Sequence, residues 1–255
     1  MRTERVCRQC AVMVEVGGRT FYVGGMSKGS GMIHPNMATM LSVTTTDVAI
    51  APDLLQEIVS EAVADSFNMI SVDRDTSTND TYLVLANGES GITVERGTKE
   101  YDAFKEAVVF VSTELAKQMA ADGEGATKLL EVRVINCRSK VNARLLAKSV
   151  ITSNLVKTAL YGSDANWGRI LCALGYSGAE FQPEDITVTI CAGDREMVLV
   201  KDGVAAAYSE EAATQLLRQE KVTFICDMKE GTAEAVAWGC DLTHEYVTIN
   251  GDYRS

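Results

Sequence analysis

The start of the chain alternates between apolar and polar positions around a Gly-Gly pair. The stretch AVMVEV-GG-RTFYV surrounds Gly17 and Gly18. Alternation of this kind is typical of strands that bury one face, and a Gly-Gly pair suits a tight turn between them. The pattern predicts a β-hairpin with strands at 11–16 and 19–23.

A glycine-rich passage of low charge, GGMSKGSGMIHPNMAT, follows at 24–39. A loop this rich in glycine is either flexible filler or backbone brought close to a ligand. The next residues, MLSVTTTDVA at 40–49, are apolar and β-branched, which predicts a buried strand.

Further along, helical and strand patterns alternate. Pro52 and Asp53 open a helix with apolar residues at helical spacing. Further helices are predicted at 102–121, 139–160 and 209–219, and strands near 69–73, 81–86, 129–137, 186–191, 196–200, 222–227 and 243–249. This interleaving indicates an α/β (α+β) fold of layered sheets covered by helices.

Composition narrows the class of protein. The 255 residues carry a net charge of −11 without a basic block, which argues against nucleic-acid and anionic-membrane partners. No apolar run reaches the roughly 18 residues of a membrane span, and the first residues do not resemble a signal peptide. Seven cysteines, an odd number, suit reduced thiols in the cytoplasm. The lone pair Cys7 and Cys10 lacks the two further ligands that a zinc site needs, so no metal is expected.

Thr39 is the candidate nucleophile. It follows the small residue Ala38 and precedes the predicted buried strand. A Thr hydroxyl needs a base, and His34 and His244 are the two histidines of the chain. The α-amine of Thr39, freed by cleavage of the chain, is another base, with a reference pKa near 8. On these residues alone, an ordinary strand threonine remains the more frequent case.

Five blocks in the same order carry a family resemblance from about residue 11 to the end of the chain. They are GGMSKGSGMIHPNMATML (24–41), SFNMISVDRDTSTNDTYLVLANG (66–88), DGEGATK (122–128), KTALYGSDANWGRI (157–170) and YVTINGDYRS (246–255). In these blocks the chain resembles the ornithine acetyltransferases, also called glutamate N-acetyltransferases or bifunctional acetyltransferases of arginine biosynthesis.

The resemblance implies a self-cleaving acyltransferase. Cleavage between Ala38 and Thr39 would divide the chain into 1–38, which is the tail of an α-chain segment with the hairpin and glycine-rich loop, and 39–255, a catalytic β-chain. The second part allows two subdomains with a junction near 125–165. Thr39 would move an acetyl group from N2-acetylornithine to glutamate through an acetyl-enzyme, by a ping-pong mechanism.

The family's substrate-binding residues match Lys28, Thr39, Glu124, Asn250 and Ser255. A lysine ammonium suits a substrate carboxylate, and a glutamate carboxylate suits a substrate ammonium. The alternatives are a solvated loop lysine for Lys28 and a surface charge at a helix end for Glu124. The blocks NWGR (166–169) and STND (77–80) are expected to shape the site without performing a step.

The resemblance also implies that no cofactor is required, with acetyl-CoA as a second acetyl donor in the two-function members. It further implies a cytoplasmic heterotetramer, with two copies of each cleaved chain.

The chain departs from the family before its hairpin. Family members are longer there by more than a third of their length, and that part holds a Thr-Gly pair credited with the oxyanion hole. They also carry Thr-Thr-Asp-Thr where this chain has MRTERVCRQC, in which Thr3 alone matches. A chain without that segment would expose strand edges and apolar surface, so either a partner segment or poor solubility is expected.

Three functional hypotheses follow. The first is an acetyltransferase that is active together with the N-terminal segment. The second is a non-catalytic fragment that folds or assembles but cannot be acetylated. The third, a Thr/Ser-nucleophile amidohydrolase with water as acceptor, is disfavoured by the matched substrate residues.

Overall fold

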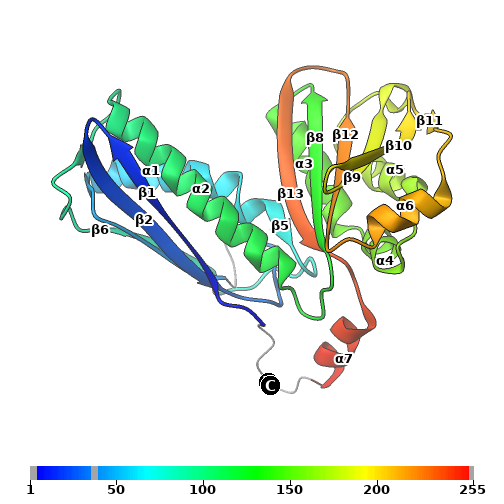
Figure 1. Ribbon diagram of the computed structural model, residues 1–255, viewed down its shortest axis with the longest axis horizontal. Coiled ribbons are helices and arrows are strands. Elements are labelled where there is room, and N and C mark those ends of the chain that lie inside the picture. The colour runs from blue at the N-terminus through cyan, green and yellow to red at the C-terminus, as the bar shows by residue number, and fades with distance from the viewer. Residues whose placement is uncertain (1–4, 36–39, 253–255) are drawn as a thin grey trace. The chain divides into compact units, whose positions relative to one another are not determined.

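The computed structural model describes residues 5–35 and 40–252. The described residues form two compact units. The first, called the hairpin unit, lies within 2–68 and 75–119, and the second, called the mixed-sheet unit, consists of 69–74 and the part after residue 119. Their strands and helices confirm the mixed, layered fold class (Figure 1).

The sheet of the hairpin unit contains the predicted hairpin. Its strands lie in the order β1-β2-β3-β6, with β1 antiparallel to β2, β2 antiparallel to β3, and β3 parallel to β6. The bounds are β1 Arg8–Val16, β2 Arg19–Lys28, β3 Leu41–Thr46 and β6 Thr81–Ala86. The prediction of a loop from residue 24 is wrong, because β2 continues to Lys28 in register with β3.

The predicted strand at 40–49 is in fact two strands. After β3 the chain bends and forms β4 (Ala49–Ile50), which pairs in parallel with β7 (Thr93–Val94). Asp47 lies in the connection, where its Oδ1 accepts a hydrogen bond of 2.8 Å from the Tyr22 amide.

One face of the hairpin-unit sheet packs against α2 (Lys99–Ala121), and α1 (Pro52–Ala64) belongs to the same unit (Figure 1). Phe21 of β2 is fully buried, and its ring centroid lies 6.1 Å from that of Phe104 in α2. The hydroxyls of Tyr82 in β6 and Ser112 in α2 lie 3.0 Å apart. Helix, hairpin and parallel strand therefore share one core.

The opposite face of this sheet is apolar and exposed, and is called the open sheet face. Its side chains alternate with the buried ones, and the strand register places them beside one another. They are Met13, Tyr22, Met26, Leu41, Val43, Leu83 and Leu85, each at least 38% exposed. Such a contiguous apolar surface is typical of a site that another segment covers.

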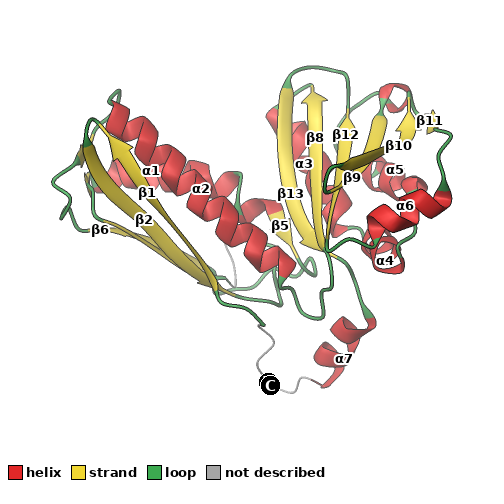
Figure 2. Ribbon diagram, viewed as in Figure 1, coloured by secondary structure: helices red, strands yellow, loops and turns green. Residues whose placement is uncertain are grey.

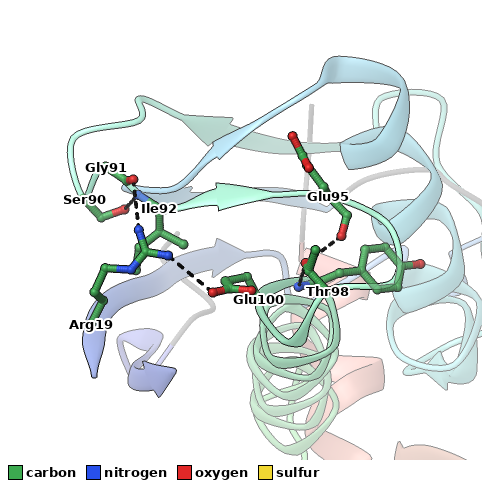
Figure 3. Close-up of polar contacts among 8 residues, drawn as sticks. Arg19, Ser90, Gly91, Ile92, Glu95, Thr98 and Glu100 are labelled. Atoms are coloured by element: carbon green, nitrogen blue, oxygen red, sulfur yellow. Dashed lines mark hydrogen bonds and ion pairs between the residues drawn. The ribbon is translucent and has the colours of Figure 1, made fainter. Parts of the chain in front are cut away.

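Helix α2 begins three residues earlier than the sequence pattern indicated. Thr98 caps it, since its Oγ1 accepts a hydrogen bond of 3.2 Å from the Tyr101 amide and donates one of 2.7 Å to the Glu95 carbonyl (Figure 3). Glu100 lies in the first turn, and its Oε1 is 3.3 Å from Arg19 Nη2. A cap and an acidic first turn both stabilise a helix start.

The mixed-sheet unit has the strand order β11-β10-β9-β12-β8-β13-β5. Strand β12 is parallel to β8, and β13 is antiparallel to β8 and parallel to β5. The bounds are β5 Ile70–Ser71, β8 Leu129–Cys137, β9 Thr187–Ala192, β10 Arg195–Lys201, β11 Val204–Ala205, β12 Lys221–Asp227 and β13 Ala233–Cys240. Predicted strands for five of these segments are confirmed within a few residues, but β13 and the short β11 were not predicted.

The helices of this unit correct the sequence interpretation in three places. The predicted helix at 139–160 is two helices, because Ser153 has an extended backbone (φ −71°, ψ 114°) and caps the second one. Helix α5 was not predicted, and the predicted strand at 243–249 is a helix, α7 (Figure 2). The bounds are α3 Lys140–Thr152, α4 Asn154–Gly162, α5 Trp167–Gly175, α6 Glu210–Leu217 and α7 His244–Asp252.

We expect Gly25→Ala to destabilise the hairpin unit. An added Cβ at this position of β2 would overlap Thr44 Oγ1 and come within 3.0 Å of Leu115 Cδ1. Overpacking of this kind costs about 1–3 kcal/mol, measurable as a lower midpoint in urea unfolding. Gly162→Ala is the control, since no heavy atom lies within 4 Å of its added Cβ. Equal midpoints for the two variants would contradict the prediction.

Candidate functional site

The predicted site residues are distributed over both units. Lys28 belongs to the hairpin unit, and Glu124 and Asn250 belong to the mixed-sheet unit. Ala38, Thr39 and Ser255 lie outside the described residues. The structure therefore shows the residues that neighbour Thr39 in the sequence, and it shows the contacts of Lys28, Glu124 and Asn250.

The residue after Thr39 is held from both sides. Met40, which is 1% exposed, donates its amide hydrogen to Asp80 Oδ1. Its carbonyl accepts a hydrogen bond of 2.7 Å from the Thr81 amide, at the start of β6. The parallel pairing of β3 with β6 therefore begins at Met40, and the entry into β3 is fixed by backbone and side chain together.

Asp80 has an unusual environment for a carboxylate. Its Oδ2 is buried and has no hydrogen-bond partner among the described residues. Burial raises the pKa of Asp80 to about 6, while the hydrogen bond from the Met40 amide acts in the opposite direction. The hydrogen bond from the Met40 amide gives Asp80, the last residue of the STND block, a role in local architecture.

Lys28 ends β2 directly opposite Leu41, two residues after Thr39 along the chain. Its side chain is exposed and borders a surface groove of about 560 Å³. Arg5 and Arg8 also border the groove, so its lining is rich in cationic groups. A cationic ammonium in an open groove can bind a substrate carboxylate.

Glu124 and Asn250 contact each other across 126 residues of sequence. Asn250 Nδ2, in α7, donates a hydrogen bond of 2.9 Å to Glu124 Oε2 and one of 3.0 Å to the Tyr246 carbonyl. The backbone at Gly125 makes this approach feasible, since its φ is +68° and an added Cβ would lie 2.6 Å from the Tyr246 nitrogen. Any other residue at 125 would push α7 away from Glu124.

Two further polar residues of this cluster were not predicted. Tyr246 Oη donates a hydrogen bond of 3.4 Å to Asp73 Oδ2. Thr243 Oγ1 donates one of 2.8 Å to the Gly125 carbonyl and accepts one of 3.3 Å from the Tyr246 amide, which caps α7. Tyr246 and Asp73 lie in the blocks that carry the family resemblance, but their type and spacing alone did not indicate a role.

A buried carboxylate fixes the loop that carries Glu124. Asp241, 3% exposed, accepts hydrogen bonds from the amides of Thr127 and Lys128 at 2.8 and 3.0 Å, and another from the Thr127 hydroxyl. The loop is therefore tied to the end of β13. Glu124 itself projects from this anchored loop and is half-buried.

The NWGR block shapes the start of a helix. Asn166 caps α5, since its Oδ1 accepts a hydrogen bond of 3.3 Å from the Arg169 amide. Arg169 Nη1 donates a hydrogen bond of 2.8 Å to the Leu155 carbonyl in α4. These contacts give the block a role at the start of α5 and in the contact between α5 and α4.

Within the described ranges, no three His, Cys, Asp or Glu side chains are grouped in a way that could hold a metal ion. In the same residues, no helix is both long enough and apolar enough to cross a membrane.

Comparison with known proteins gives a consistent set of matches. A sequence model of the ArgJ family matches residues 1–255. The arginine biosynthesis bifunctional protein ArgJ of Symbiobacterium thermophilum is 51% identical over 256 residues, and ArgJ 1 of Clostridium acetobutylicum is 49% identical over 256 residues. Each match covers 100% of this chain and 63% of the relative. The chain thus spans less than two thirds of the length of these relatives.

A solved structure also matches the fold. The crystal structure of the arginine biosynthesis bifunctional protein argJ from Bacillus halodurans has a TM-score of 0.77 and 42% sequence identity. The match covers 84% of this chain and 100% of the solved one. These findings confirm both the fold class and the family resemblance that the sequence blocks indicated.

We expect Asp80→Asn to change how stability depends on pH. The pKa of Asp80 rises from 3.8 to about 6 on folding, so the folded state binds a proton more tightly than the unfolded state. The contribution of Asp80 to stability therefore decreases as pH rises from about 4 to about 6. Urea midpoints at several pH values should show this decrease in the wild type and a smaller one in Asp80→Asn.

Asp47→Asn provides the matched control for this experiment. Asp47 also accepts a backbone amide in the hairpin unit, from Tyr22. If the urea midpoints of the wild type and of Asp80→Asn changed with pH in parallel, that result would contradict the assignment of a raised pKa to Asp80.

Proposed function

Because the chain belongs to the ArgJ family, we propose that it is the catalytic part of an acetyltransferase of arginine biosynthesis. It moves the acetyl group of N2-acetylornithine to glutamate, with Thr39 as nucleophile. The observation that carries the proposal is the hydrogen bond between Glu124 and Asn250. Two residues assigned to the same substrate from separate sequence blocks lie together, on an anchored loop and on a helix.

The first step is cleavage of the chain. The Thr39 hydroxyl oxygen attacks the Ala38 carbonyl carbon, the Ala38–Thr39 C–N bond breaks, and the hydroxyl proton ends on the Thr39 nitrogen. Water then hydrolyses the resulting ester, which leaves a carboxylate on Ala38 and restores the Thr39 hydroxyl. The product is a chain that begins with a free α-amine next to its own nucleophile.

Turnover uses the same hydroxyl. The Thr39 α-amine takes the hydroxyl proton, the oxygen attacks the acetyl carbonyl carbon, and the proton passes to the ornithine nitrogen as the C–N bond breaks. The amine of glutamate then attacks the acetyl-Thr39 ester and restores the hydroxyl. Lys28 would bind a substrate carboxylate and Glu124 a substrate ammonium, with Asn250 and Ser255 as further contacts.

The open sheet face gives the missing segment a place to bind. The longer relatives contain residues that this chain lacks, since 63% of their length is matched. We propose that this segment covers Leu83, Leu85 and their apolar neighbours, and that it brings the oxyanion donors to Thr39. Losing one such donor typically costs about 10²–10³ in rate.

The alternative function is that of a non-catalytic fragment. The residues Lys28, Glu124 and Asn250, which match the family's substrate-binding positions, favour the enzyme over this alternative. The relatives are named bifunctional, and acetyl-CoA is the second donor to assay. A cytoplasmic location and a heterotetramer of cleaved chains remain predictions, as does the absence of a cofactor.

We expect Thr39→Ala to abolish both cleavage and transfer. The wild type, co-expressed with the segment of the Symbiobacterium thermophilum relative that this chain lacks, should give two masses that divide between Ala38 and Thr39. It should also transfer acetyl from N2-acetylornithine to glutamate. Removing the nucleophile should lower the transfer rate by at least about 10⁴-fold. Thr45→Ala, on the following strand, should cleave and transfer normally.

The outcomes separate the hypotheses. A wild type that stays uncut with the segment present contradicts the processing proposal. A wild type that is cut but transfers no acetyl group supports the non-catalytic alternative. Acetate released without glutamate supports the amidohydrolase.

We expect a charge on the open sheet face to prevent binding of the missing segment. Leu83 and Leu85 are 49% and 56% exposed on neighbouring positions of this face. Leu83→Glu with Leu85→Glu should lose co-purification with the segment and leave the melting temperature of the chain alone within a few degrees, because no buried contact is removed. Val141→Glu, at a residue 65% exposed in the other unit, is the control. Co-purification of the double variant would overturn the assignment.

A further inference from the structure

We propose that Thr243 is the positioning residue of the subsite that binds the substrate ammonium. Its hydroxyl joins the loop of Glu124 to the first turn of α7, the helix that carries Asn250. The inference rests on the proposed acetyl transfer from N2-acetylornithine, whose side chain ends in an ammonium, and adds to it the group that holds two substrate contacts together. All of these residues belong to the mixed-sheet unit.

The hydroxyl of Thr243 is buried, and it both donates and accepts a hydrogen bond. Thr243 is 5% exposed. Its Oγ1 donates a bond of 2.8 Å to the carbonyl of Gly125, the residue after Glu124, and accepts one of 3.3 Å from the Tyr246 amide. The second bond is that of a helix N-cap. One oxygen atom therefore links the loop to the start of α7.

Helix α7 depends on such polar contacts. None of its residues is buried, so it has no apolar face anchored in the core, as most surface helices have. The bond from Tyr246 to Asp73 and the ring contact between His244 and Tyr161 also hold the helix, but neither reaches the loop of Glu124. Thr243 is therefore the buried link between this helix and that loop.

The position of α7 decides which atom of Asn250 is left for a ligand. An asparagine amide has two N–H donors and one oxygen acceptor. Both donors are used, since Nδ2 donates to Glu124 Oε2 at 2.9 Å and to the Tyr246 carbonyl at 3.0 Å. Because a carboxylate and a carbonyl accept hydrogen bonds, these partners fix the orientation of the amide. Asn250 Oδ1 therefore remains as an acceptor.

Glu124 supplies the charge that this acceptor lacks. Its Oε2 accepts the Asn250 amide, and no Lys or Arg of the described chain forms an ion pair with it. A carboxylate beside an amide oxygen offers acceptors and a negative charge, which suits an ammonium and disfavours a second carboxylate. The pair therefore selects the ammonium of N2-acetylornithine for as long as α7 keeps Asn250 against Glu124.

Loss of the Thr243 hydroxyl would remove that condition. The Gly125 carbonyl would lose its donor, and the Tyr246 amide would lose its cap. Helix α7 would then shift relative to the loop, and the acceptors of Glu124 and Asn250 would separate. The defect should appear in the affinity for a ligand that carries the ammonium, and not in the rate at saturation.

The test replaces Thr243 with Val, which has the same shape without the hydroxyl, in the protein assembled with the missing segment. N2-acetylornithine is the donor, at saturating glutamate. N2-acetylnorleucine, in which a methyl group replaces the ammonium, is a competitive inhibitor. We expect Thr243→Val to raise the KM of N2-acetylornithine about tenfold, and to leave kcat and the Ki of N2-acetylnorleucine within about twofold. KM and Ki do not depend on the fraction of folded enzyme, so partial unfolding cannot imitate this result.

Two variants are matched controls. Thr243→Ser keeps the hydroxyl and should restore the KM of the wild type. Thr248→Val removes a hydroxyl from the same helix, where it donates a bond of 3.2 Å to the His244 carbonyl, and should change neither KM nor Ki. If Thr243→Val does not fold, Thr243→Ala, which adds no new group, decides by the same two constants.

The outcomes separate this inference from the proposed function. A wild type that transfers no acetyl group overturns both. An active wild type overturns the role of Thr243 alone if KM is unchanged in Thr243→Val, or if KM and Ki rise by the same factor. A fall in kcat at unchanged KM also overturns it, because that result indicates a general loss of structure. A rise confined to the KM of the ammonium donor, and reversed in Thr243→Ser, supports it.

Discussion

The hydrogen-bonded entry into β3 is the constraint on which the candidate chemistry depends. Met40 is held through its amide by Asp80 and through its carbonyl by Thr81, so the backbone that follows Thr39 has no freedom to shift. Effective attack by a hydroxyl needs its reacting atoms held close to the productive geometry. Strand β3 is itself held on both edges, because β2 and β6 flank it in register.

The contact between Glu124 and Asn250, two residues proposed to bind substrate, is built differently. Glu124 projects from a loop that Asp241 ties to β13, and Asn250 reaches it from an exposed helix. The close approach depends on Gly125, whose positive φ removes a side chain from the path of α7. Backbone pairing thus fixes the entry into β3, whereas Glu124 and Asn250 are joined through side chains on a loop and a helix.

Strong local patterns made most of the fold predictable. The hairpin, α1 and the alternating strand β8 followed from period and turn chemistry. The errors arose where a local contact overrides the pattern: Ser153 interrupts an apolar helical run, and Thr243 caps a segment, YVTIN, whose β-branched residues resemble a strand. Strand β13 was missed because AEAVAWGC consists mainly of small residues and becomes a strand by pairing with β8.

The residues of the candidate site also divide into those that the sequence predicted and those that only the structure revealed. Lys28, Thr39, Glu124, Asn250 and Ser255 came from family blocks, whereas Asp73 and Tyr246 needed coordinates, because nothing in their spacing brings them together. Asp80 was predictable in one of its two features and not in the other. Its hydrogen bond to a backbone amide was foreseeable for an Asp before a strand, but the buried second oxygen was not. That oxygen is buried only in the folded chain, where Asp80 reaches Met40 beside the parallel pairing of β3 with β6.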